Sequence, residues 1–119
     1  MTGFRVLLDA CVLVPIYKAD LLLTFAEHRT YSPHWSDRIV EETATAIPLA
    51  TRGAVSAERA QRRVQMMNDA FEDALIEGWG PLEAAIHGLP DPDDRHVVAA
   101  AVRGSAAAIV TDNVKDFPL

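Results

Sequence analysis

The stretch Phe4-Arg5-Val6-Leu7-Leu8-Asp9 decides the fold class of this chain. Its apolar run predicts a buried strand over residues 4–8, with Asp9 at the carboxyl end. A second apolar run over residues 107–110 leads into the polar loop Thr111-Asp112-Asn113. Because both runs are apolar rather than alternating, and helical patterns separate them, we predict an α/β fold with a parallel sheet and right-handed crossovers.

Four helical patterns lie between the two apolar runs. Each has apolar residues at spacings of three and four, and most have a capping or helix-breaking residue at their ends. The first covers residues 16–28, before Tyr31 and Pro33 break the period. The other three are expected from the cap Ser36 to a break at Pro48, from the cap Ser56 to breaks at Gly78 and Gly80, and from the cap Asp91 to Arg103.

The two predicted strands both run directly into an acid, Asp9 and Asp112. Ligands of parallel sheets bind outside the carboxyl ends of the strands, so we expect these two acids to converge. Asp9 interrupts apolar sequence without a turn-forming residue beside it, which favours a functional role over a strand-end turn.

Asp94 is a third acid in an unusual position. At 100° per residue it lies on the midline of an apolar helical stripe formed by Val97, Val98, Ala101 and Val102. Burying a carboxylate there costs several kcal/mol unless it is hydrogen-bonded, neutralised or bound to a metal. A first-turn capping role and a functional role both fit Asp94 at this stage.

The overall charge restricts the classes of partner. Seventeen acidic and eleven basic residues give a net charge of −6, which excludes a simple electrostatic binder of nucleic acid. A single cysteine, Cys11, forms no internal disulfide and no thiolate cluster for zinc, which favours a reducing, cytoplasmic location. The sequence has no apolar run long enough for a membrane span and no signal-peptide pattern, so we expect no membrane partner.

Converging carboxylates without cysteine clusters predict an all-oxygen site, which suits Mg²⁺ or Mn²⁺. Such ions lower the pKa of a bound water and neutralise charge on phosphate oxygens. They would also offset the negative charge of the chain, so the pattern points to chemistry on phosphates.

Four segments carry a family resemblance: Val6-Leu7-Leu8-Asp9 with Val12-Leu13, and residues 35–42, 89–101 and 109–118. The third is the most specific, because an acid opens a helix in the pattern acid-x-x-aliphatic-aliphatic-Ala. Together these segments span nearly the whole chain. They resemble the PIN-domain family of metal-dependent ribonucleases, which includes the VapC toxins of bacterial toxin–antitoxin pairs.

This resemblance implies a single PIN-like domain over residues 1–119, folded as a three-layer α/β/α sandwich around a parallel sheet. It also implies that Mg²⁺ or Mn²⁺ is bound by four acids, namely Asp9, Glu42, Asp94 and Asp116, with Asp112 as an alternative fourth ligand. Glu42 is preferred to Glu41 because it completes the spacing Ser-x-x-aliphatic-aliphatic-x-Glu. Asn113 and Asp116 match the polar pair of the family pattern Thr-x-Asn-x-x-Asp-Phe.

The implied reaction is hydrolysis of single-stranded RNA by a metal-activated water, leaving a 5′-phosphate and a 3′-hydroxyl. The implied partners are the RNA substrate, an antitoxin protein and a second copy of the chain.

The chain departs from the family pattern in two places. Cys11 stands where the family usually has Asn, Ser or Thr, and a thiol is the weaker hydrogen-bonding group, so we expect reduced activity. Related domains continue past the position of Leu119 into a further strand, so we expect a domain truncated at its C-terminus, without its last strand.

These departures keep two alternatives open. One is a catalytically impaired PIN-fold module that acts through protein interactions. The other is an aspartate-nucleophile phosphotransferase similar to the haloacid dehalogenases, although Cys11 occupies the position where that family has a second acid.

Other side chains of the chemical types found in nuclease sites receive plainer interpretations. On the helical wheel His96 lies away from the apolar stripe, so we predict that it faces solvent. Trp35 fits a stacking platform for a base or an anchor in a core or interface. Arginines on the third helix are expected on a solvated face rather than against RNA phosphates; these are Arg59, Arg62 and Arg63.

Overall fold

The computed structural model describes residues 4–112 and contains one four-stranded parallel sheet. The strands lie in the order β3-β2-β1-β4. Their bounds are β1 Arg5–Leu8, β2 Ser32–Ser36, β3 Leu75–Ile76 and β4 Ala108–Val110. The α/β class, the parallel sheet and the two strands predicted from apolar runs are therefore confirmed.

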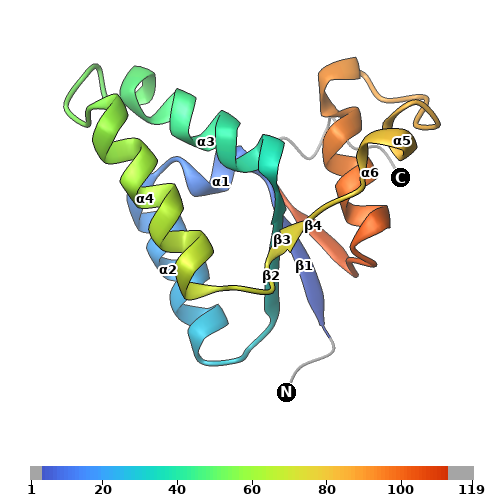
Figure 1. Ribbon diagram of the computed structural model, residues 1–119, viewed down its shortest axis with the longest axis horizontal. Coiled ribbons are helices and arrows are strands. Elements are labelled where there is room, and N and C mark those ends of the chain that lie inside the picture. Colours follow the sequence, from blue (N-terminus) through green and yellow to red (C-terminus); the bar gives the residue numbers. More distant parts are fainter. Residues whose placement is uncertain (1–3, 113–119) are drawn as a thin grey trace.

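Helices cover both faces of this sheet (Figure 1). On one side are α1 (Ala10–Leu13), α2 (Ile16–Glu27), α3 (Asp37–Ala50) and α4 (Ala57–Ala70). On the other side are α5 (Gly80–Glu83) and α6 (Arg95–Arg103), with the 3₁₀ turn η1 (Pro92–Asp94) leading into α6. The arrangement is the three-layer α/β/α sandwich expected from the sequence. None of the helices in the described part of the chain is long and apolar enough to cross a membrane.

The register of the sheet brings the strand ends to one edge. Leu8 pairs with Val110, and the backbone N–H of Asp9 donates to the carbonyl of Val110 over 3.1 Å. The neighbouring strand β2 ends at Ser36, whose hydroxyl accepts from the N–H of Ile39 and so begins α3. The carboxyl edge of β1, β2 and β4 therefore positions Asp9, the start of α3 and Thr111 together.

Strands β2 and β3 were not predicted. Residues 31–33 were expected only to break the helical pattern that precedes them, yet Pro33 lies within β2 and pairs with Val6. The short strand β3 pairs with β2 only at Trp35 and Ser36, so β2 is still an edge strand at Pro33. A proline is tolerated at such a position because one side of the strand carries no ladder of hydrogen bonds.

Two predicted helix ends were also wrong. Helix α3 continues through Pro48 to Ala50, because a proline this close to the end of a helix removes a single backbone hydrogen bond. Helix α4 begins after its predicted cap Ser56 but ends at Ala70, and Phe71 is its C-cap. The chain between Phe71 and Gly80 instead forms a turn, the strand β3 and the approach to α5.

The core lies between α3, α4, α6 and the sheet. Its largest fully buried side chains include Trp35, Leu7, Leu8 and Leu13. Trp35 donates from Nε1 to Oδ1 of Asn68 over 2.7 Å and meets the ring of Phe71 edge to face at 6.1 Å. Of the two roles considered for Trp35, the structure shows the core anchor.

Candidate functional site

A cleft of about 800 Å³ opens at the carboxyl edge of the sheet, between α3 and the start of α6. Three of the predicted acids line it: Asp9 after β1, Glu42 on α3 and Asp94 at the start of α6. These residues are far apart in the sequence, and the parallel topology brings them to one place. Other side chains that line the cleft include Cys11, Asp37, Arg38, Glu41 and Trp79.

Asp9 is held firmly at the base of this cleft, with only 7% of its surface exposed. Its Oδ1 accepts from the N–H of Ala10 over 2.8 Å, which makes Asp9 the N-cap of α1. Its Oδ2 accepts from the hydroxyl of Thr111 over 3.0 Å and lies 3.7 Å from the sulfur of Cys11. These donors compensate the cost of burying a carboxylate.

Cys11 connects the ends of β1 and β4. Its Sγ lies 3.3 Å from the hydroxyl of Thr111 and accepts from the N–H of Asp112 over 3.2 Å. Burial raises the pKa of the Cys11 thiol, against its hydrogen bonds with the Thr111 hydroxyl and the Asp112 N–H, which lower it. The residue is therefore a protonated thiol at neutral pH and supports Asp9 through hydrogen bonds rather than as a thiolate.

Of the residues predicted in the last loop to bind or support a metal, Asp112 lies in the described part of the chain. The carboxylate of Asp112 forms an ion pair with Lys18 on α2 at 2.5 Å, and both side chains are about half exposed. Exposed pairs of this kind contribute little to stability. Asn113 and Asp116 lie outside the described residues.

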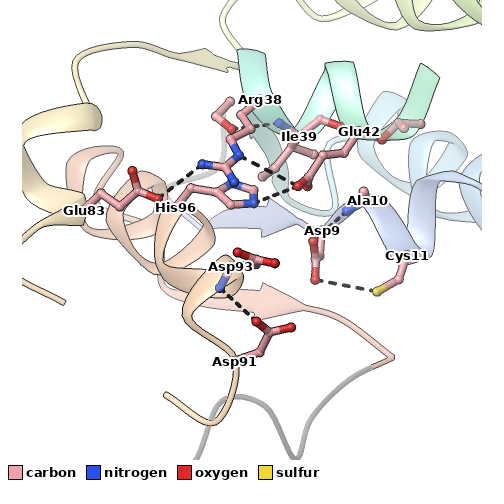
Figure 2. Close-up of polar contacts among 12 residues, drawn as sticks. Asp9, Ala10, Cys11, Arg38, Ile39, Glu42, Glu83, Asp91, Asp93 and His96 are labelled. Carbon is pink, nitrogen blue, oxygen red and sulfur yellow. Dashed lines mark hydrogen bonds and ion pairs between the residues drawn. The ribbon is translucent and has the colours of Figure 1, made fainter. Parts of the chain in front are cut away.

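Glu42 is the centre of a network of charged and polar side chains (Figure 2). Its Oε2 lies 3.2 Å from Nε2 of His96 and 3.9 Å from Nε of Arg38. Arg38 also reaches Oε2 of Glu83 through Nη1, at 3.3 Å. Glu41, the neighbour that the helical wheel did not separate from Glu42, lines the cleft but is exposed.

The prediction that His96 faces solvent was wrong, because only 1% of its surface is exposed. Helix α6 packs against β1 and β2 and also against α5, so it is covered on two sides. Its buried face contains His96, Ala99 and Ala100, whereas Val102 is 58% exposed. Two residues of the predicted stripe, Val97 and Ala101, are also buried, so the buried face is wider than the wheel predicted and includes His96.

Asp94 occupies the N-cap position of α6, where its side chain accepts no capping hydrogen bond from the described backbone. The cap of the preceding turn is Asp91, whose carboxylate accepts from the N–H of Asp93 over 2.9 Å. A capping role therefore does not account for the half-buried Asp94, and its place in the cleft favours the functional interpretation.

The donor set of the cleft fits a hard divalent cation. Asp9, Glu42 and Asp94 offer carboxylate oxygens, the ligands that Mg²⁺ and Mn²⁺ prefer. Over residues 4–112 no three His, Cys, Asp or Glu side chains are grouped closely enough to hold an ion by themselves. The three acids thus line one cleft without forming a closed ligand set there.

The structure corrects the expectation for Arg63 and adds Trp79 to the residues of the cleft. Arg63, expected on a solvated face, is half-buried and donates to the carbonyls of Leu13 and Val14, so it caps the end of α1. Trp79 lines the cleft and donates from Nε1 to Oδ1 of Asp37 over 2.9 Å. Sequence reasoning missed Trp79 because its only local signal is its place beside two glycines.

A family model described as PIN domain matches residues 5–115, which is most of the chain. No curated protein and no solved structure shows a significant match.

Proposed function

Because the chain belongs to the PIN-domain family, we propose that it is a metal-dependent endoribonuclease that hydrolyses phosphodiester bonds of single-stranded RNA. PIN domains are nucleases that generally use divalent metals, so nuclease-type activity follows from the family. The observation that carries the finer proposal is that Asp9, Glu42 and Asp94 line one cleft at the carboxyl edge of the sheet.

In this proposal the cation is Mg²⁺ or Mn²⁺, held by Asp9, Glu42 and Asp94 with Asp116 as the fourth acid. When bound, such an ion supplies an activated water at neutral pH and neutralises charge on the phosphate. It also reconciles an acidic chain with an anionic substrate, since the net charge of −6 opposes RNA binding.

Groups of the protein itself hold Asp9 in place and bring a positive charge into the cleft. The N–H of Ala10 and the hydroxyl of Thr111 fix both oxygens of Asp9. Arg38 brings a guanidinium into the cleft, about two fifths exposed, and guanidinium groups pair well with phosphate oxygens. The cleft therefore combines an acid held in place by hydrogen bonds, Asp9, with the guanidinium of Arg38, which an RNA backbone can reach.

The biological setting is also part of the proposal. We place the protein in the cytoplasm as the toxin of a toxin–antitoxin pair, with an antitoxin and a second copy of the chain as protein partners. The support is the similarity to the PIN family and the lone, half-buried Cys11, which is typical of a reducing compartment.

A second candidate function is a PIN-fold interaction module without catalysis. Two observations favour it: Cys11 stands beside Asp9, and residues 4–112 form no closed metal group. This candidate predicts a folded protein that binds no Mn²⁺ at saturating concentration.

The deciding experiment is calorimetric titration of Mn²⁺ into the wild type, Asp9→Asn and Asp94→Asn. Asp93→Asn is the matched control, since Asp93 is an exposed acid next to Asp94. We expect saturable binding in the wild type and the control, and at least a tenfold loss in the other two. Cleavage of a fluorescent single-stranded RNA, with a duplex of the same sequence as comparison, tests the reaction. Absence of Mn²⁺ binding in the wild type would support the interaction module.

A further inference from the structure

His96 is a buried polar residue that the proposed reaction does not yet use. It follows Asp94 by two residues on α6, and its Nε2 lies 3.2 Å from Oε2 of Glu42 on α3. Figure 2 shows its ring between α6 and the carboxylate of Glu42. The contact joins the two helices that carry two of the three acids lining the cleft.

The chemistry of this contact fixes the donor. An ionised carboxylate can only accept hydrogen bonds, so Nε2 of His96 must carry the hydrogen. The other ring nitrogen, Nδ1, is buried and has no hydrogen-bond partner among the described residues. The contact of Nε2 with Oε2 of Glu42 is therefore the polar contact that the His96 ring makes among the described residues.

The surroundings of His96 hold its ring in place. The residue is 1% exposed, and the ring of Trp79 lies against it with centroids 6.0 Å apart. Arg38, the other partner of Glu42, is more distant at 3.9 Å, is 39% exposed and is shared with Glu83. Of the two partners of Glu42, His96 makes the shorter contact and is the one whose own side chain is buried.

We propose that His96 is a positioning residue for Glu42, which it holds at the cleft through the 3.2 Å contact between Nε2 and Oε2. The described contacts with His96 and Arg38 both engage Oε2, which leaves Oε1 as the oxygen for a cation. The inference rests on the proposed function, because it takes Glu42 to be a metal ligand. Partners that orient a ligating carboxylate in this way typically change metal affinity 10- to 100-fold when they are removed.

The test compares two replacements of His96 by their Mn²⁺ affinity, measured by calorimetry. The side-chain nitrogen of glutamine reaches the position of Nε2, so His96→Gln keeps the donor. Leucine fills the space without a donor, so His96→Leu removes it. We expect the affinity of His96→Leu to fall about 10- to 100-fold and that of His96→Gln to stay within about threefold of the wild type.

Two controls separate positioning from folding. His34→Gln replaces the other buried histidine, on β2 and outside the cleft, and is expected to leave Mn²⁺ affinity unchanged. His96→Asn carries its nitrogen at the position of Nδ1, too short to reach Glu42. It is expected to match His96→Leu, and it replaces that variant if the leucine prevents folding, as judged by circular dichroism.

A double-mutant cycle identifies the residue through which His96 acts. In a Glu42→Gln background, His96→Leu should weaken Mn²⁺ binding no further. Equal affinities for the wild type, His96→Leu and His96→Asn would overturn the role of His96 while leaving the metal site intact. Tighter binding in His96→Leu would also overturn it, because His96 would then compete for Glu42. Absence of Mn²⁺ binding by the wild type would overturn the proposed function itself, and the role of His96 with it.

Discussion

The hydroxyl of Thr111 donates a hydrogen bond to Oδ2 of Asp9 over 3.0 Å, although the two residues are 102 positions apart. This bond joins the carboxyl ends of β1 and β4. A hydrogen bond to a charged group contributes about 1.5 to 3 kcal/mol net, so we expect Thr111→Val to lower the free energy of unfolding by that amount. Thr111→Ser keeps the hydroxyl and should lose less than half as much. The free energy of unfolding of both variants is measured by urea denaturation, with tryptophan fluorescence as the signal. Equal midpoints for the wild type and the two variants would contradict the expectation.

Glu41 and Glu42 offer a matched pair for the metal assignment. Both line the cleft, but Glu42 is the one in contact with His96. We expect Glu42→Gln to abolish cleavage of single-stranded RNA and to weaken Mn²⁺ binding at least tenfold, because the carboxamide lacks the negative charge. Glu41→Gln should change either quantity by less than about twofold, since an exposed side chain is screened by water. If Glu41→Gln had the larger effect instead, Glu41 rather than Glu42 would be the metal-binding acid on α3.

His34 makes stability depend on pH. It is 3% exposed, and its pKa is lowered from 6.5, mainly by burial and also by Arg5, against the raising effects of the Ala74 carbonyl and Asp73. The unfolded chain therefore takes up this proton first as the pH falls. The contribution of His34 is fully present above pH 6.5 and is lost as the pH falls towards the lower pKa of the folded state.

One such group changes the free energy of unfolding by at most about 1.4 kcal/mol per pH unit. We expect the wild type to lose more stability than His34→Gln between pH 7.5 and pH 5.5, measured by urea denaturation at each pH. Parallel pH profiles for the two proteins would show that His34 is not the group responsible.

Gly104 ends α6 where the chain passes close to β3. A Cβ at this position would come closest to Cδ1 of Ile76, and it would lie 3.0 Å from Cγ1 of the same residue and 3.3 Å from the carbonyl oxygen of Ala100. Its φ of −86° suits any residue, so crowding alone decides the effect of a substitution. We expect Gly104→Ala to cost about 1 to 3 kcal/mol in thermal or urea unfolding. Gly80→Ala is the control, because a Cβ at Gly80 meets no described atom within 4 Å and should be neutral or stabilising.

Arg63 secures the short helix that follows Asp9. Its guanidinium donates to the carbonyls of Leu13 and Val14, at the end of α1. We expect Arg63→Met to lower the free energy of unfolding by about 1 to 3 kcal/mol, since two carbonyls lose a charged donor. The exposed neighbour Arg62 is the control, and Arg62→Met should stay within about 0.5 kcal/mol of the wild type. Equal losses in the two variants would indicate an effect of net charge instead.

Local sequence patterns predicted the parts of the fold where one physical factor dominates. The apolar runs before Asp9 and Thr111 became β1 and β4, and Ser36 and Ser56 cap the helices that were expected to follow them. Parallel topology predicted that Asp9 and Asp112 converge, whereas the grouping of Asp9 with Glu42 and Asp94 was expected only from the family resemblance. The predictions of the strands and helix starts needed only burial, capping and the direction of the strands.

The sequence could not supply the parts that depend on neighbours. Pro33 is compatible with β2 only because β3 pairs further along the strand, and no local pattern shows where a neighbouring strand begins. His96 is buried because α5 covers a second side of α6, and α5 itself was not predicted. The contact of His96 with Glu42 is likewise a property of two helices that pack together.

The strand order also has a consequence for how the protein is made. β1 lies between β2 and β4, and in the sequence β4 comes only after the other three strands. Until residues 108–111 have left the ribosome, Asp9 lacks both the backbone bond to Val110 and the side-chain bond to Thr111. The proposed nuclease therefore orders Asp9 only after the segment that carries β4 has been synthesised.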